Sequence, residues 1–228
     1  MIPVYIGYDS RMELVSSVLI HSINVRASEP VQFTLLNLNQ LKNVFHRELH
    51  ALQSTEFSFS RFLVPYLSNY EGFSIFMDND MIMLDDVASL WALRDEDYAV
   101  QVVQHTHQPR EDTKFLGEKQ TRYEKKNWSS VMLFNNARCK ALTPEYVNTA
   151  SGLELHQFKW LGDDSQIGEL PHRWNHLVDY DPHSKDVSLL HYTLGGPYYA
   201  AYTDCDYRDE WNHEYEDMQH IIQKKMDK

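Results

Sequence analysis

The stretch that decides the fold runs from residue 74 to residue 83 and reads SIFMDNDMIM. Three strongly hydrated residues, Asp78, Asn79 and Asp80, stand between two apolar runs. The first run is short and follows Gly72, so it has the length and setting of a buried strand. Because a carboxylate is costly to bury without a partner, the two acids indicate a cation held inside the fold.

The spacing of the two acids favours a shared ligand. If the chain stays extended from Asp78 to Asp80, the period of two sends both carboxylates to the same side. Two carboxylates that close repel each other unless a cation lies between them, and Mg²⁺ or Mn²⁺ prefers such oxygen ligands. The alternative interpretation is a simple turn, since Asp and Asn favour turns. The immediate return to an apolar run at residues 81–84 argues for buried structure instead.

Strand-like and helix-like segments alternate around this stretch. Strands are expected at residues 3–9, 31–38, 73–77, 98–103, 129–134 and 188–192. Helices are expected at residues 13–25, 59–70 and 87–93, and after the Thr143-Pro144 start signal. The alternation predicts an α/β fold with a mostly parallel central sheet flanked by helices, and 228 residues suit a single domain, 1–228.

The C-terminal residues 204–228 are heavily charged, but Trp211, Tyr215, Met218 and Ile222 recur near helical spacing. We expect a helical tail packed on its own domain. The alternative is peripheral docking on a partner or membrane surface through the lysines at its end.

Composition narrows the class of protein. Hydrophobic residues make up 43% and charged residues 24%, as in a soluble globular protein. The 33 acids exceed the 21 Lys and Arg residues, and the net charge of −12 argues against a nucleic-acid partner. Two distant cysteines, the lack of a signal-peptide pattern and the lack of an apolar run of about 20 residues lead us to expect a cytoplasmic protein with no transmembrane segment.

A third candidate ligand lies in VSLLHYTLGGPYY, residues 187–199, where His191 ends a strand-like run. A lone histidine there is more often structural. Combined with the acid pair, however, it gives a mixed carboxylate and imidazole set, which suits Mn²⁺ better than Mg²⁺.

Several stretches together resemble the family 8 glycosyltransferases, retaining enzymes of the GT-A fold that use nucleotide-diphosphate sugars. The resemblance covers residue 2 to about residue 199. Its segments, in order, are VYIGYD, FSRFLVPYL, FMDNDMIM, VMLFN, WLGDDSQI and HYTLGGPYY.

The resemblance implies roles for individual residues. Asp78, Asp80 and His191 would hold Mn²⁺ or Mg²⁺ against the donor diphosphate. Asp163 and Asp164 fall at the catalytic acidic pair near the transferred sugar, although either could instead cap a helix at residues 165–170. Donor-binding roles are implied for six residues: Tyr8, Asp9, Arg61, Asn79, Gly195 and Gly196.

Two departures from the family pattern stand out. Gly196-Pro197-Tyr198 occupies the place where the family often carries a phosphate-binding Lys, and Trp128-Ser129-Ser130 replaces its Asn-Ala-Gly. A polar loop at residues 108–126, with Lys125 and Lys126 near its end, could supply the missing positive charge by closing over the donor.

The expected activity is metal-dependent transfer of a hexosyl group from a nucleotide-diphosphate sugar, with UDP-sugar favoured, to the hydroxyl of a saccharide or other acceptor. Retention would follow the family, by attack on the leaving-group face or through a transient adduct on Asp164. Three alternatives stay open: a phosphohydrolase or phosphotransferase with the first Asp of Asp-x-Asp as nucleophile, a non-catalytic nucleotide-sugar-binding protein, and a nucleotidyltransferase.

Overall fold

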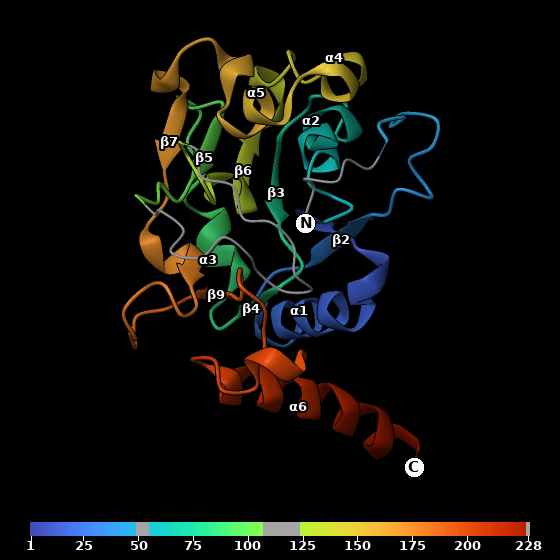
Figure 1. Cartoon of the computed structure of the whole chain (residues 1–228), viewed down its shortest axis with the longest axis vertical. Helices are drawn as coiled ribbons and strands as arrows, with labels where there is room; N and C mark the ends of the chain where they lie inside the picture. Colours follow the sequence, from blue (N-terminus) through green and yellow to red (C-terminus); the bar gives the residue numbers. More distant parts are fainter. Residues whose placement is uncertain (49–54, 107–123, 227–228) are drawn as a thin grey trace.

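The computed structural model describes residues 1–48, 55–106 and 124–226. The strands are β1 Ile2–Gly7, β2 Val31–Leu36, β3 Phe73–Met77, β4 Met81–Met83, β5 Val100–Val102, β6 Val131–Asn135, β7 Ile167–Glu169, β8 His176–Leu177 and β9 Leu189–His191. The helices are α1 Glu13–Arg26, α2 Val64–Leu67, α3 Val87–Trp91, α4 Pro144–Thr149, α5 Gly152–His156 and α6 Arg208–Met226. Figure 1 shows them as an α/β arrangement, and the predicted fold class is confirmed.

A six-stranded sheet with the order β2-β1-β3-β6-β5-β7 forms the centre. Three of its pairings are parallel: β1 with β2, β1 with β3, and β5 with β7. β6 runs antiparallel to both of its neighbours, β3 and β5. The sheet is therefore mainly parallel with one reversed strand. A second sheet, of order β4-β9-β8, lies beside it.

Apolar side chains alternate across the central sheet and build a core on each face. From β3, Phe76 joins the core under α2, α4 and α5, whereas Ile75 and Met77 join the core under α1 and α3. From β6, Phe134 and Leu133 divide in the same way. Because helices cover both faces of the sheet, successive residues of β3 and β6 are nearly all buried, and the sequence of each strand is a nearly continuous apolar run.

The Asp-Asn-Asp segment joins the two sheets. Asp78 N donates to Ser130 O at 2.9 Å, which extends the pairing of β3 with β6 in the central sheet. Tyr192 N donates to Asp80 O at 2.9 Å, which extends the pairing of β4 with β9 in the second sheet. Asn79 and Asp80 form a bend, so the expected extended chain through all three residues is wrong. The carboxylates converge because the chain changes sheets here.

Two predicted helices differ from the structure. Residues 59–70 form a 3₁₀ helix, Ser60–Leu63, followed by the short α2. Pro65 lacks the N–H that would donate to Arg61 O, so a continuous α-helix is interrupted there.

The segment after Asp164 forms a 3₁₀ turn, Asp164–Gln166, and then strand β7 in place of a helix at 165–170. Gly168 lies opposite Gln101 of β5, and a Cβ at that position would come within 2.5 Å of the Tyr98 ring. Close pairing with β5 decides the conformation of this segment.

The helix α6 packs against α1, as Figure 1 shows at the lower edge of the molecule. Its Trp211 is buried and Tyr215 and Met218 pack around it. Glu214 is also buried and pairs with α1, at 2.6 Å from His21 Nδ1 and 2.8 Å from Arg26 Nη2. Residues 208–218 of α6 thus lie against α1. None of the helices in the described part of the chain has the length and apolar character needed to cross a membrane.

Candidate functional site

Asp78, Asp80 and His191 meet where the two sheets join. One potential ligand atom from each lies within 4.8 Å of the others. His191 Nε2 is 3.4 Å from Asp80 Oδ1 and 4.0 Å from Asp78 Oδ2. The strand pairing produces this meeting, because Met81 of β4 lies opposite His191 of β9 in the antiparallel register.

A buried asparagine orients the His191 ring. Asn175 Nδ2 donates to Asn127 O at 3.3 Å and to Ser130 Oγ at 2.8 Å. Since a carbonyl oxygen only accepts, this fixes the amide with Oδ1 facing His191 Nδ1, 3.0 Å away. His191 Nδ1–H therefore donates to Asn175, and Nε2 faces the two carboxylates. Ligating histidines in metal sites are commonly held in this way.

Arg61 borders the cluster from the other side. It is 5% exposed, and its Nη1 lies 2.6 Å from Asp78 Oδ1 and donates to Ser129 O at 2.8 Å. Its guanidinium carbon lies about 5 Å from the ring centres of Phe57 and Phe76. The helix containing Arg61 thus brings a positive charge against the first acid of the pair.

The donor set suits a divalent cation. Two carboxylates and one correctly oriented imidazole offer hard oxygen ligands with a borderline nitrogen, which fits Mn²⁺. Two carboxylates as close as Asp78 and Asp80 repel each other, and nearby positive charge such as that of Arg61, 2.6 Å from Asp78, favours their ionised forms. These residues can hold a metal, which would offset negative charge on a bound diphosphate.

Asp9 is fully buried at the end of β1, and both of its oxygens are occupied. They accept hydrogen bonds from the Arg11 backbone, from Arg11 Nε and Nη2, and from Glu56 N. Burial alone would raise the pKa of Asp9, but the Arg11 hydrogen bonds and charge, with the Glu56 amide, hold that pKa below its ordinary value. Asp9 thereby holds the partly exposed side chain of Arg11 in place. Its neighbour Tyr8 is half-buried.

The glycine turn after His191 places tyrosines beside the cluster. Gly195 has φ +136°, and a Cβ on Gly196 would come within 2.4 Å of the Tyr198 ring. Burial and then the Asp80 charge raise the pKa of Tyr198 well above its ordinary value. Burial raises the pKa of Tyr199, on which the charges of Arg11, Asp9 and Asp80 also act. Both glycines therefore shape the wall of the site.

Asn79 turns away from the two acids. Its Nδ2 donates to Ser16 Oγ at 3.1 Å, and Ser16 belongs to α1. This hydrogen bond links the Asp-Asn-Asp bend to α1 and holds the bend in place.

Asp163 and Asp164 are exposed and have different partners. Asp163 caps the 3₁₀ turn, accepting from Ser165 N and Oγ at 2.9 Å each, and these bonds lower the pKa of its carboxyl. Asp164 pairs with Lys125 Nζ at 2.5 Å, and the same ammonium donates to Gln157 O. Lys125, near the end of the 108–126 loop, thus pairs with one of the two predicted catalytic acids. Residues 107–123 of that loop lie outside the described residues.

Sequence reasoning missed Asn175, Arg11 and the two tyrosines. Tyr198 and Tyr199 lie in the quoted HYTLGGPYY segment, so they could have been found. Asn175 lies 16 positions before its partner, at the end of a short 3₁₀ helix, and no local pattern marks it.

Asn175→Ala is expected to weaken Mn²⁺ binding by about 10- to 100-fold, because His191 loses the acceptor that fixes its tautomer and ring orientation. Titration of the purified protein with Mn²⁺ by isothermal calorimetry measures the change. Asn148→Ala is the matched control, because it removes another side-chain amide, one that donates to Pro144 O of α4 and to Val44 O and accepts from His46 N. Equal Mn²⁺ affinity in Asn175→Ala and wild type would contradict the orienting role.

Comparisons with known proteins agree with this architecture. The sequence matches no protein-family model. The fold matches the bifunctional glycosyltransferase WbbM (TM-score 0.65, 15% identity, 94% of this chain) and the glycosyltransferase GlyE of Streptococcus pneumoniae (0.64, 15%, 99%). The chain spans 49% of the WbbM chain and 64% of the GlyE chain.

The match to the galactosyltransferase LgtC, solved with donor and acceptor sugar analogues, has a TM-score of 0.60 at 12% identity and covers 95% of this chain and 96% of LgtC. The chain therefore has the GT-A glycosyltransferase fold. By sequence it is 43% identical over 234 residues to Protein CDI of Arabidopsis thaliana, with 98% of this chain and 90% of that protein covered. It belongs to the same family as Protein CDI.

Proposed function

We propose that the chain is a metal-dependent, family 8-like glycosyltransferase that moves a sugar from a nucleotide-diphosphate sugar, with UDP-sugar the favoured donor, to a hydroxyl acceptor with retention. The main support is that the carboxylates of Asp78 and Asp80 and Nε2 of His191 lie close together where the two sheets join. The GT-A fold supports this assignment, because open α/β sheets bind ligands at the carboxyl ends of their strands.

In this proposal the Asp-x-Asp pair and His191 hold Mn²⁺ or Mg²⁺, which would offset charge growing on the leaving diphosphate. The chain itself orients the donor. Arg11 is held by Asp9, and Arg61 is held by Asp78. We propose that these two arginines supply the positive charge that the family's lysine, absent from Gly196-Pro197-Tyr198, would provide. Tyr8, at the end of β1, is proposed to contact the base or ribose.

Asp163 and Asp164 are proposed to face the transferred sugar. Both are exposed, and the ion pair with Lys125 Nζ, 2.5 Å away, positions the Asp164 carboxylate. Attack of the acceptor on the leaving-group face needs only such positioning and charge stabilisation from the protein. We therefore favour this route over an adduct on Asp164.

The phosphohydrolase alternative requires Asp78 to act as a free nucleophile. Asp78 lies instead 2.6 Å from Arg61 Nη1, inside an ion pair with little solvent access. Asp78 is thus better suited to hold a cation than to attack a phosphoester.

A thermal-shift screen of nucleotide sugars, each with Mn²⁺ or with EDTA, tests the proposal. A donor that binds only the folded state, at a free concentration 100 times its Kd, should add about 2.7 kcal/mol to the free energy of unfolding. We expect that shift for UDP-sugars with Mn²⁺ and its loss with EDTA, together with slow release of UDP in the absence of acceptor. Hydrolysis of a generic phosphoester without any response to nucleotide sugars would contradict the proposal and favour the phosphohydrolase.

A further inference from the structure

A second group of metal-ligating side chains lies apart from the Asp-x-Asp cluster. His105 follows β5, His172 begins the 3₁₀ helix His172–Asn175, and Asp181 follows β8. One ligand atom from each lies within 4.8 Å of the others. We refer to His105, His172 and Asp181 as the histidine cluster.

The contacts inside the cluster bring the three side chains to one point. His172 Nε2 is 3.3 Å from Asp181 Oδ2, and the rings of His105 and His172 meet edge to face with centres 5.2 Å apart. The backbone fixes both ends: His105 O accepts from Trp128 Nε1 at 2.8 Å, and Leu177 N donates to Asp181 Oδ2 at 2.6 Å. The ligands are thus largely positioned before any ion arrives.

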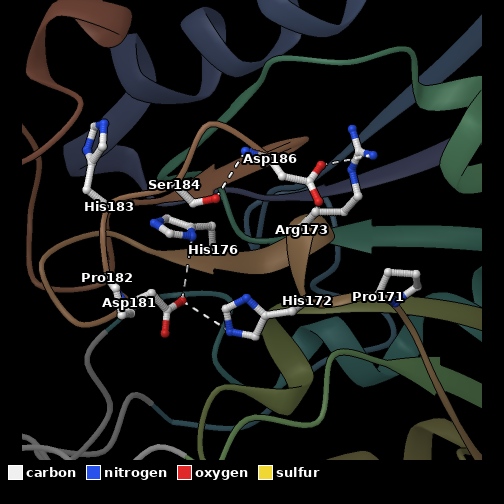
Figure 2. Close-up of a pocket in the computed structure, with 9 residues that line it drawn as sticks. All are labelled: Pro171, His172, Arg173, His176, Asp181, Pro182, His183, Ser184 and Asp186. Carbon is white, nitrogen blue, oxygen red and sulfur yellow. Dashed lines mark hydrogen bonds and ion pairs between the residues drawn. The ribbon is translucent and has the colours of Figure 1, made fainter.

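A cavity of about 420 Å³ opens beside the cluster and is lined by His172, His176 and Asp181 among others. Figure 2 shows the His172 and His176 rings both turned toward the Asp181 carboxylate. His176 is 3% exposed, its Nδ1 lies 4.0 Å from Asp181 Oδ2, and its buried Nε2 makes no hydrogen bond with any residue that the structure describes.

Positive charge at the cavity does not oppose a cation. Arg173, which also lines it, pairs with Asp85 at 3.0 Å and with Asp186 at 3.1 Å. Figure 2 shows its guanidinium turned toward Asp186 and away from Asp181.

We propose that His105, His172 and Asp181 form a zinc site, with His176 adjacent to complete or support it. Two imidazoles and one carboxylate are a common ligand set for Zn²⁺, and room at the cavity leaves a position for water. The ligand balance is opposite to that of Asp78, Asp80 and His191, where two carboxylates favour Mn²⁺. We therefore expect the histidine cluster to prefer Zn²⁺, and the site of Asp78, Asp80 and His191 to prefer Mn²⁺.

Such a site would join the segment after β5 to the 3₁₀ helix His172–Asn175 and to the loop after β8. His172 and Asn175 occupy the two ends of one 3₁₀ helix, and Asn175 orients His191. Zinc bound at His172 would hold that helix in place, and with it Asn175, the hydrogen-bond partner of His191.

Equilibrium dialysis of the full chain with Zn²⁺ alone, followed by metal quantification, tests the proposal. Asp80→Asn serves as the background, because it weakens the other candidate site. In that background we expect one bound Zn²⁺ per chain, and His172→Asn should weaken its binding about tenfold or more. His213→Asn is the matched control: His213 also lies near an Asp, 3.5 Å from Asp217, but on the exposed face of α6.

His172 is a suitable position for substitution because its side chain is 55% exposed and its loss should leave the fold unchanged, as circular dichroism can verify. A rise in the thermal midpoint with Zn²⁺, lost in His172→Asn and kept in His213→Asn, would support the site by an independent readout. Unchanged Zn²⁺ affinity and stoichiometry in His172→Asn would overturn the proposal. Equal losses in both variants would do so as well, since they would indicate surface binding.

Discussion

Asp80→Asn is expected to reduce Mn²⁺-dependent sugar transfer or donor hydrolysis about a hundredfold or more, because one of the two carboxylate ligands is lost. The metal-free protein should behave differently. Replacing one charge of a close carboxylate pair relieves its repulsion with Asp78, so the thermal midpoint without metal should be unchanged or higher. The signature is thus lost activity with retained stability.

Two measurements check this result: UDP release from donor at saturating Mn²⁺, and thermal unfolding in EDTA. Asp97→Asn is the matched control, because Asp97 is exposed on a loop and its substitution removes the same charge. If Asp80→Asn kept wild-type activity, or gained activity with EDTA, the Asp-x-Asp pair would not hold the required ion. A large drop in the metal-free midpoint would instead assign Asp80 a structural role.

Arg61→Met is expected to destabilise the metal-free protein by about 3 kcal/mol. Methionine retains packing against Phe57 and Phe76 but leaves Asp78 without the guanidinium 2.6 Å away. The stability falls because the largely buried Asp78 carboxylate loses its ion pair with Arg61. Removing one partner of such a pair costs more free energy than the intact pair contributes. Mn²⁺ should recover part of the stability, because it supplies a new positive charge to Asp78.

Denaturant unfolding of a double-mutant cycle separates this charge effect from packing. The double variant Arg61→Met with Asp78→Asn should recover much of the stability lost by Arg61→Met, since the orphaned charge is gone. Additive effects of the two substitutions would show that Arg61 stabilises the fold through packing and through its bond to Ser129 O. Arg61→Lys should fall between wild type and Arg61→Met, because lysine keeps the charge without the planar guanidinium geometry.

Local sequence signals fixed the start points of several elements. Asp86 caps α3 by accepting from Ala88 N, and Thr143 caps α4 by accepting from Tyr146 N, directly before Pro144. These features were predictable because a cap and the helix it starts are neighbours in the chain. The buried strand ending at Met77 was predictable for a similar reason, since its apolar run is uninterrupted.

Strand direction and long-range pairing were not visible in the sequence. The pattern of β6 is the same whether it runs parallel or antiparallel, because alternation of side chains across a sheet does not depend on direction. The segment after Asp164 contains helix-compatible residues, yet contact of Gly168 with Tyr98 and Gln101 makes it a strand. Tertiary contact outweighs local preference in such short segments.

For the candidate site, the sequence by itself determined its two acids and its histidine, because Asp78 and Asp80 interrupt an apolar run and His191 ends another. Only the tertiary structure decided how they are held: Arg61 against Asp78, Asn175 behind His191 and Lys125 on Asp164. The histidine cluster likewise exists only in the folded chain. A carboxylate inside an apolar run is conspicuous because of its immediate neighbours, whereas each of these partners comes close only after the chain has folded back on itself.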